Sequence, residues 1–189
     1  MYVLKNLLSI IVVALCFWIL PVSAVDIAAG EQKAANCIAC HGSKGKSSAP
    51  EWPNLAAQSA PYIVNQLHAF KAGARKNSVM QAMAANLSED DISNLAAYFS
   101  HQSPVSAGGD PELAKLGQSK AAMCLGCHGS SAEGNGQFPR LAGQHPNYLV
   151  KQLQDFKGGI RKGGPMGSLA GSLSEDDMKR LAAYFGSIK

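Results

Sequence analysis

Two short cysteine–histidine motifs are the residues of this chain best suited to chemistry. Each reads Cys-x-x-Cys-His, first as Cys37-Ile38-Ala39-Cys40-His41 and again as Cys124-Leu125-Gly126-Cys127-His128. This pattern is the attachment signature of c-type haem, because two thiols on one turn can form thioethers with the vinyl groups on one porphyrin edge. The adjacent histidine is then carried beneath the iron as a ligand. We therefore predict two covalently bound haem c groups, attached through Cys37, Cys40, Cys124 and Cys127, with His41 and His128 as iron ligands.

Three other uses of paired cysteines agree less well with this sequence. A thioredoxin-like redox pair expects a preceding strand and a βαβ context, which the sequence pattern does not offer. A four-cysteine zinc site needs pairs that lie closer together, since 83 residues separate Cys40 from Cys124. Two disulfides would leave both histidines without a role.

Each iron needs a second axial ligand, which should recur in both motifs' surroundings. Methionine and histidine are the ordinary partners of a haem-bound histidine. Met80 and Met166 recur, 39 and 38 residues after their histidines, so we predict them as axial ligands, with Met83 as the one serious competitor. Coordination by histidine and methionine leaves no open iron position, which favours electron transfer over catalysis.

The remaining methionines and histidines do not recur, which favours structural roles. Core packing is the expectation for Met83, Met123 and Met178. Surface or helix-capping positions are the expectation for His68, His101 and His145. The carbonyl groups of Pro53 and Pro139 are candidate acceptors for the N–H of the two motif histidines.

The motifs lie within an internal duplication that covers almost the whole chain after its start. Pro53-Asn54-Leu55-Ala56-Ala57-Gln58 matches Pro139-Arg140-Leu141-Ala142-Gly143-Gln144, and Leu-Ser-Glu-Asp-Asp recurs at 87–91 and 173–177. The start itself has Lys5, an apolar run and Val22-Ser23-Ala24, the order of a secretory signal peptide. We predict a signal peptide at 1–24, a first domain at 25–102, a linker at 103–109, a second domain at 110–189, and a periplasmic location.

The pattern of apolar residues predicts helices that position these motifs. A short Ala-rich helix leads into each motif, and a second helix begins near Pro61 or Pro146. A last helix begins at a capping box, formed by Ser88 with Asp91 and by Ser174 with Asp177. Behind each box, apolar residues follow at i, i+3, i+4 and i+7. No alternating pattern indicates a strand, so the predicted fold is all-α.

Composition limits the remaining function classes. The chain has 189 residues, of which 16% are charged and 47% hydrophobic, with a formal net charge of +4. This is typical of a globular protein and gives little support for nucleic-acid binding. Val25–Gln102 has six basic and six acidic residues, whereas Ala107–Lys189 has ten and seven. We hypothesise that an acidic partner docks on this more positive half, through Lys157, Arg161 or Lys162.

Taken together, these motifs resemble a class I cytochrome c duplicated into a dihaem protein, similar to the cytochrome c4 family. The resemblance covers about residues 27–189 and includes both haem motifs, both methionines and both helix starts. It implies two tandem cytochrome c domains related by a pseudo-twofold axis, with the haem edges close. It also implies Gly30 and Gly117 as the small residues where first and last helices cross, facing Tyr98 and Tyr184.

The same resemblance implies a function and partners. It implies a periplasmic carrier, not an enzyme, that passes single electrons from the respiratory chain to a haem–copper terminal oxidase. The donor would be a quinol-oxidising complex or a dehydrogenase, and peripheral association with the membrane stays open. The alternative is an electron-accepting subunit of a dehydrogenase complex that oxidises sulfide, thiosulfate or alcohol. A dihaem peroxidase would need one iron with an open site, against which two recurring methionines argue.

Overall fold

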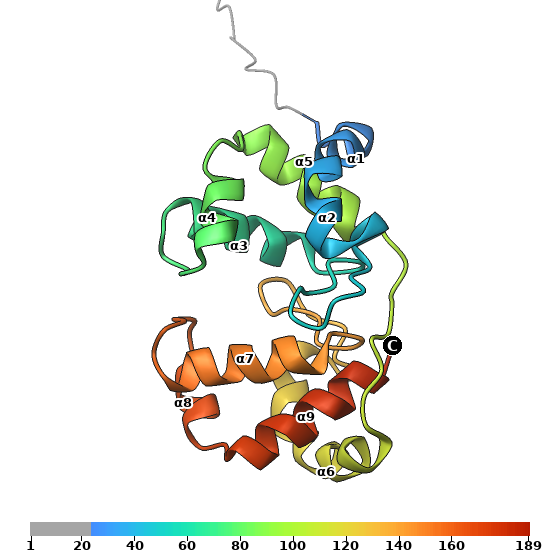
Figure 1. The fold of residues 1–189 in the computed structure, drawn as a ribbon, viewed down its shortest axis with the longest axis vertical. Coiled ribbons are helices and arrows are strands. Elements are labelled where there is room, and N and C mark those ends of the chain that lie inside the picture. Colours follow the sequence, from blue (N-terminus) through green and yellow to red (C-terminus); the bar gives the residue numbers. More distant parts are fainter. Residues whose placement is uncertain (1–23) are drawn as a thin grey trace, which may run out of the picture.

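All regular secondary structure in residues 24–189, the part of the chain that this computed structural model describes, is helical (Figure 1). The predicted signal peptide falls almost wholly on residues 1–23, outside this part. Within the described part no strand forms, and one isolated bridge pairs Asn135 with Phe138. The prediction of an all-α fold is confirmed.

Two sets of helices follow the sequence repeat. The first half contains α1 (Ile27–Ala34), α2 (Ile38–His41), α3 (Ala60–Lys71), α4 (Ser78–Ala84) and α5 (Glu89–Ser100), with 3-10 turns at Ala35–Cys37 and Ser43–Gly45. The second half contains α6 (Pro111–His128), α7 (Pro146–Lys157), α8 (Met166–Gly171) and α9 (Glu175–Ser187). The halves stack along the long axis of the molecule, and the loops that follow the two histidines lie between them (Figure 1).

The helices α3 and α7 begin where the two prolines predict. Pro61 and Pro146 lie in their first turns, where a missing N–H costs no helical hydrogen bond. The helices α4 and α8 were not predicted, since seven and six residues are too few to show a helical period. Asn77 caps α4 by accepting a hydrogen bond from the Met80 N–H at 2.9 Å.

The last helix of each half begins as the capping boxes predict and supplies its core. Both boxes are complete, with side chain and backbone bonded reciprocally. Every member of the two predicted apolar stripes is buried: Ile92, Leu95, Ala96, Phe99, Met178, Leu181, Ala182 and Phe185. Each half therefore has its own hydrophobic cluster around its last helix.

Glycine allows the first helix of each half to cross the last at close range. A Cβ at Gly30 would overlap the carbonyl oxygen of Asn94 and lie 3.0 Å from the Tyr98 Cβ. A Cβ at Gly117 would overlap the Arg180 carbonyl oxygen and lie 3.0 Å from the Tyr184 Cβ. The crossings implied by the resemblance are thus present in both halves.

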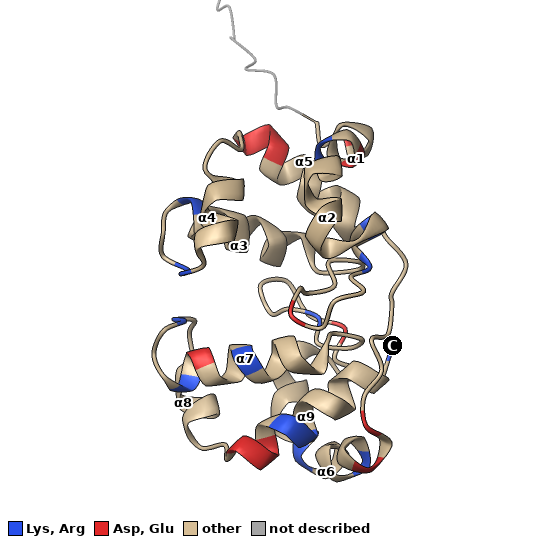
Figure 2. Ribbon diagram, in the orientation of Figure 1, with Lys and Arg blue, Asp and Glu red and all other residues tan. Residues whose placement is uncertain are grey.

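A matched ion pair reinforces each crossing. Lys33 lies 2.9 Å from Asp91, and Lys120 lies 2.8 Å from Asp177. Hydrogen bonds from Lys120 and then Ser174 lower the pKa of Asp177 to about 2. The acidic first turns of α5 and α9 lie at the ends of the molecule farthest from the contact between the halves (Figure 2).

The segment between the halves packs on the second half. The Ala107 N–H donates to the Gly143 carbonyl at 3.1 Å, and the Gly108 N–H to the Gly186 carbonyl at 3.0 Å. Gly143 has a positive φ of 74°, and a Cβ there would overlap the Val105 carbonyl oxygen. Most of this Ser/Pro/Gly-rich stretch is therefore fixed to the second half. None of the helices within residues 24–189 combines the length and apolarity that a bilayer span requires.

The close crossing makes Gly117 sensitive to a single added methyl group. We expect Gly117→Ala to destabilise the haem-loaded protein by about 2 kcal/mol, because the methyl group must displace backbone of α9. Gly171→Ala is the matched control, since a Cβ there meets nothing within 4 Å. Thermal unfolding followed by circular dichroism measures both. Equal melting temperatures for the two variants would contradict the close-packing explanation.

Candidate haem-binding sites

The two motif histidines are held in the same way. The His41 Nδ1 lies 2.9 Å from the Pro53 carbonyl oxygen, and the His128 Nδ1 lies 2.8 Å from the Pro139 carbonyl oxygen. Because a carbonyl only accepts, Nδ1 carries the proton and donates in both cases. This leaves each Nε2 with its lone pair available for a metal. The predicted proline acceptors are thus confirmed.

Both histidines are buried, 6% and 5% exposed. Burial lowers the pKa of His41, and the hydrogen bond to Pro53 opposes this in part. The pKa of His128 is lowered by burial against the same opposition from Pro139. The neutral imidazole, the form that binds metals, is therefore favoured.

Methionines and histidines meet at a single large cavity. Its volume is about 1150 Å³, beyond the roughly 300–1000 Å³ of a pocket for one small molecule. Its walls come from both halves and include His41, Met80, His128 and Met166. The short helices α4 and α8 supply the two methionines. The structure thus brings all four predicted iron ligands to the same cavity.

Three of the four motif cysteines line this cavity. They are Cys37, Cys124 and Cys127, whereas Cys40 is half-buried and does not line it. Burial and then the neighbouring Cys40 raise the pKa of the Cys37 thiol, and burial raises that of Cys124. None of these four cysteines, all within the described residues, forms a disulfide. Nor does any cluster of three or more His, Cys, Asp or Glu side chains in 24–189 offer a zinc site.

The other methionines divide between core and cavity. Met178 is 1% exposed and belongs to the core, as predicted. The core prediction is wrong for Met83 and Met123, which are 44% and 50% exposed and border the cavity.

A glutamine side chain from each half pairs with the backbone of the other half. The Gln58 Oε1 accepts from the Arg140 N–H at 2.7 Å, and its Nε2 donates to the Arg140 carbonyl at 3.0 Å. The Gln144 amide makes the same two contacts with Asn54, at 2.8 and 2.9 Å. Since Asn54 and Arg140 are equivalent in the repeat, this exchange is symmetric. It supports the pseudo-twofold relation between the halves.

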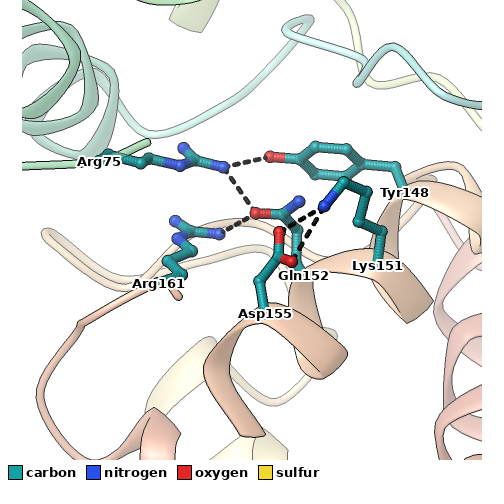
Figure 3. A network of polar contacts seen from close by, with 6 residues as sticks. All are labelled: Arg75, Tyr148, Lys151, Gln152, Asp155 and Arg161. Atoms are coloured by element: carbon teal, nitrogen blue, oxygen red, sulfur yellow. Dashed lines mark hydrogen bonds and ion pairs between the residues drawn. The ribbon is translucent and has the colours of Figure 1, made fainter. Parts of the chain in front are cut away.

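An arginine from each half extends this contact at the cavity. The Arg75 Nη2 donates to the Tyr148 hydroxyl at 2.9 Å and to Gln152 Oε1 at 2.7 Å (Figure 3). Its Nη1 donates to Gln66 Oε1 at 2.7 Å. The guanidinium lies over the Phe70 ring, 4.6 Å from its centroid. Arg75 thus joins both halves by hydrogen bonds.

Arg161 makes the mirrored contacts. Its Nη1 donates to Gln152 at 2.7 Å, and its Nη2 donates to the Tyr62 hydroxyl at 2.8 Å and to Gln66 at 3.0 Å. Arg161 is therefore an interface residue, and not the free docking charge hypothesised from the sequence. Lys157 is also engaged, since its Nζ donates to the Leu173 carbonyl at 2.5 Å.

Sequence reasoning missed this interface. His145, expected at the surface or as a cap, stands at the N-cap position of α7, but its side chain makes no capping bond. It is 8% exposed, and its Nε2 lies 3.1 Å from the Ser47 carbonyl oxygen across the contact. The glutamines, tyrosines and arginines recur in the repeat, but recurrence alone does not show which surface they face. His68 and His101 do lie at the surface, and His68 is 3.2 Å from Glu89.

The residues around the cavity fit two haem groups. Each half offers an oriented, buried imidazole and a methionine, beside cysteines spaced to lie on one helical turn. The aromatic rings of Trp52 and Phe138 lie edge-on to His41 and His128, with centroids 6.5 and 6.1 Å apart. The guanidinium groups of Arg75 and Arg161 line the cavity, where they suit the propionate carboxylates of haem.

Comparison with known proteins agrees with this geometry. The sequence profile of the family described as Cytochrome c matches residues 27–103 and 114–189. The chain is 40% identical over 186 residues to cytochrome c4 of Azotobacter vinelandii, which covers 86% of this chain and 89% of that protein. It is 35% identical over 178 residues to the thiosulfate dehydrogenase electron acceptor of Thiomonas intermedia (strain K12), with 87% and 81% covered. The crystal structure of reduced recombinant cytochrome c4 from Pseudomonas stutzeri gives a TM-score of 0.81 at 38% identity, covering 88% of this chain and 100% of that one.

The repeated profile, the matching dihaem structure and the paired sites lead to one conclusion. The protein carries two covalently bound haem c groups in two tandem cytochrome c domains, and it is a dihaem electron-transfer cytochrome. The chain belongs to the cytochrome c4 family.

Proposed function

We propose that this protein is a periplasmic electron carrier without substrate chemistry of its own. The first haem would be held by Cys37, Cys40, His41 and Met80, and the second by Cys124, Cys127, His128 and Met166. One observation carries the proposal: each buried histidine is fixed through Nδ1 to a proline carbonyl, with Nε2 free, at a cavity that also receives the recurring methionine. The proposed domains are 25–102 and 110–189, joined by 103–109.

The residues of the chain suit this function by what they hold in place. When bound, each haem supplies an iron that gains and loses one electron. The proline carbonyls fix the tautomer and orientation of the histidines, and hydrogen bonding at Nδ1 makes Nε2 a stronger donor. The thioethers of Met80 and Met166 would supply the second iron ligand in each site, which would favour ferrous iron and leave no position for a substrate. Fixed ligands that change little between oxidation states suit rapid electron transfer.

The proposed physiological acceptor is a haem–copper terminal oxidase, supplied by a quinol-oxidising complex or a dehydrogenase. This assignment rests on the family resemblance. A second candidate role is electron acceptor of a thiosulfate-oxidising enzyme. It is supported by 35% identity to the thiosulfate dehydrogenase electron acceptor of Thiomonas intermedia, over 87% of this chain.

Ligand substitution tests the iron sites. We expect Met80→Ala and Met166→Ala each to remove about half of the far-red methionine-to-iron charge-transfer absorbance, since each would free one axial position. Each ferrous variant should bind one CO per chain, whereas the unaltered protein, with two haems per chain by mass, should bind none.

Met83→Ala is the matched control, because Met83 lies one helical turn from Met80 and also borders the cavity. It should keep both the absorbance and the resistance to CO. Loss of absorbance in Met83→Ala, with Met80→Ala unaffected, would assign the first iron to Met83. A high-spin, CO-binding haem in the unaltered protein would overturn the carrier proposal in favour of a catalytic site.

Electron delivery separates the two candidate roles. We expect the reduced protein to be reoxidised by membranes that contain a haem–copper oxidase, in a reaction that cyanide stops. Under the second role, a thiosulfate dehydrogenase would reduce the ferric protein and purify with it, whereas the oxidase-containing membranes would not reoxidise the reduced protein. Stopped-flow absorbance of the ferrous haem band measures both rates.

A further inference from the structure

The two haem sites differ in one buried charge. In the loop that follows each histidine, Asn54 of the first half stands where the second half has Arg140. Both side chains are buried, at 6% and 9% exposed, and both line the cavity. Each immediately follows the proline whose carbonyl holds the histidine of its own site. The substitution therefore places a guanidinium in the loop that holds His128 and a neutral amide in the loop that holds His41.

Both polar atoms of the neutral side chain have a hydrogen-bond partner, but one nitrogen of the charged side chain has none. The Asn54 Oδ1 accepts from the Ser47 N–H at 2.9 Å, and its Nδ2 donates to the Gly143 carbonyl at 2.8 Å. The Arg140 Nε donates to the Ala142 carbonyl at 3.1 Å, while its Nη2 is buried without a hydrogen-bond partner among the described residues. A buried donor on a charged group is costly unless something pairs with it.

The charges near Arg140 do not cancel it. Glu133 acts on Arg140 electrostatically, but its carboxylate is exposed and accepts from the Ser131 N–H at 2.8 Å. In the first half the corresponding position holds Lys46, which is also exposed. Water and salt screen such exposed charges far more than a buried guanidinium. The first loop also carries Lys44 and Glu51, which are exposed. Arg140 is thus the one buried charge that distinguishes the two loops within the described residues.

We propose that Arg140 makes the two haem sites electrostatically unequal, by holding the second haem more strongly in its ferrous state than a neutral residue would. This rests on the proposed assignment of His128 to the second haem. Ferrous iron carries one positive charge less than ferric iron, so a nearby buried cation favours reduction. The unpaired Nη2 is also a donor of the kind that binds carboxylates, and the propionates are the carboxylates that haem provides.

The size of the effect follows from Coulomb's law. For an assumed separation of roughly 12 Å between the charge and the iron, and an effective dielectric constant of about 20, a unit charge changes the equilibrium about tenfold. For a one-electron couple, a tenfold change corresponds to about 59 mV. Arg140 acts through the iron environment and is a positioning residue, not a ligand.

The test is a spectroelectrochemical titration of the haem-loaded protein, with the two one-electron steps resolved. We expect Arg140→Gln to lower the ferrous-to-ferric ratio of the second haem about tenfold at a fixed potential, and to change that of the first haem less than twofold. Arg140→Asn, which copies the side chain of the first half, should do the same and serves if the glutamine variant does not fold. Arg140→Lys retains the charge and should stay within about threefold of the unaltered protein.

Two further variants complete the design. Lys115→Gln removes an exposed charge from α6 and should leave both steps unchanged. Met166→His should lower the midpoint potential of the second haem only, and so shows which of the two one-electron steps belongs to that haem. The proposal is overturned if Arg140→Gln leaves the midpoint potential of the second haem unchanged, or if it shifts the potentials of both haems equally. It is also overturned if Arg140→Lys shifts the potentials as Arg140→Gln does. If Met166→His does not change the midpoint potential of one haem alone, the result would instead contradict the assignment of Met166 as a ligand.

Discussion

The loop after each motif histidine is bonded both to that histidine and to a glutamine of the other half. The geometry of each haem site and the relative placement of the two sites depend on these bonds. The Pro53 carbonyl accepts from His41, and the next residue bonds through its N–H and carbonyl to Gln144 of the other half. The loop at Pro139 is held in the same way by His128 and Gln58. A shift of either loop would therefore move a proposed iron ligand and break a contact between the domains at the same time.

Local rules predicted the parts of this structure that depend on few residues. A capping box needs two side chains and a backbone turn, so Ser88 with Asp91 specified the start of α5. A haem motif needs five consecutive residues. The short helices that carry Met80 and Met166 were not predicted, because tertiary contacts and a single cap decide whether so few residues become helical. Met80 and Met166 were predicted as ligands only because they recur.

The interface could not be predicted for a different reason. A glutamine that bonds backbone of another domain looks the same in sequence as a solvated one, as the recurring Gln58 and Gln144 illustrate. His145 replaces a residue that is serine in the first half, so its burial left no signal in the repeat. Comparison of the two copies identifies residues that both halves share. It does not identify contacts that form only between the halves. The difference between Asn54 and Arg140 is visible in the sequence, but the burial of these two side chains is not.

The segment at 103–109 favours association of the two domains, because it links them in one chain. Polar side chains make most of the named contacts between them, and such contacts between separate proteins commonly give weak, transient complexes. Here the second domain binds the connecting segment itself, through Ala107 and Gly108. Only a short stretch of chain is therefore free to allow separation of the domains. The tether acts as a high effective concentration. Evolution could therefore alter residues between the haem sites, as at position 140, without losing the pairing of the domains.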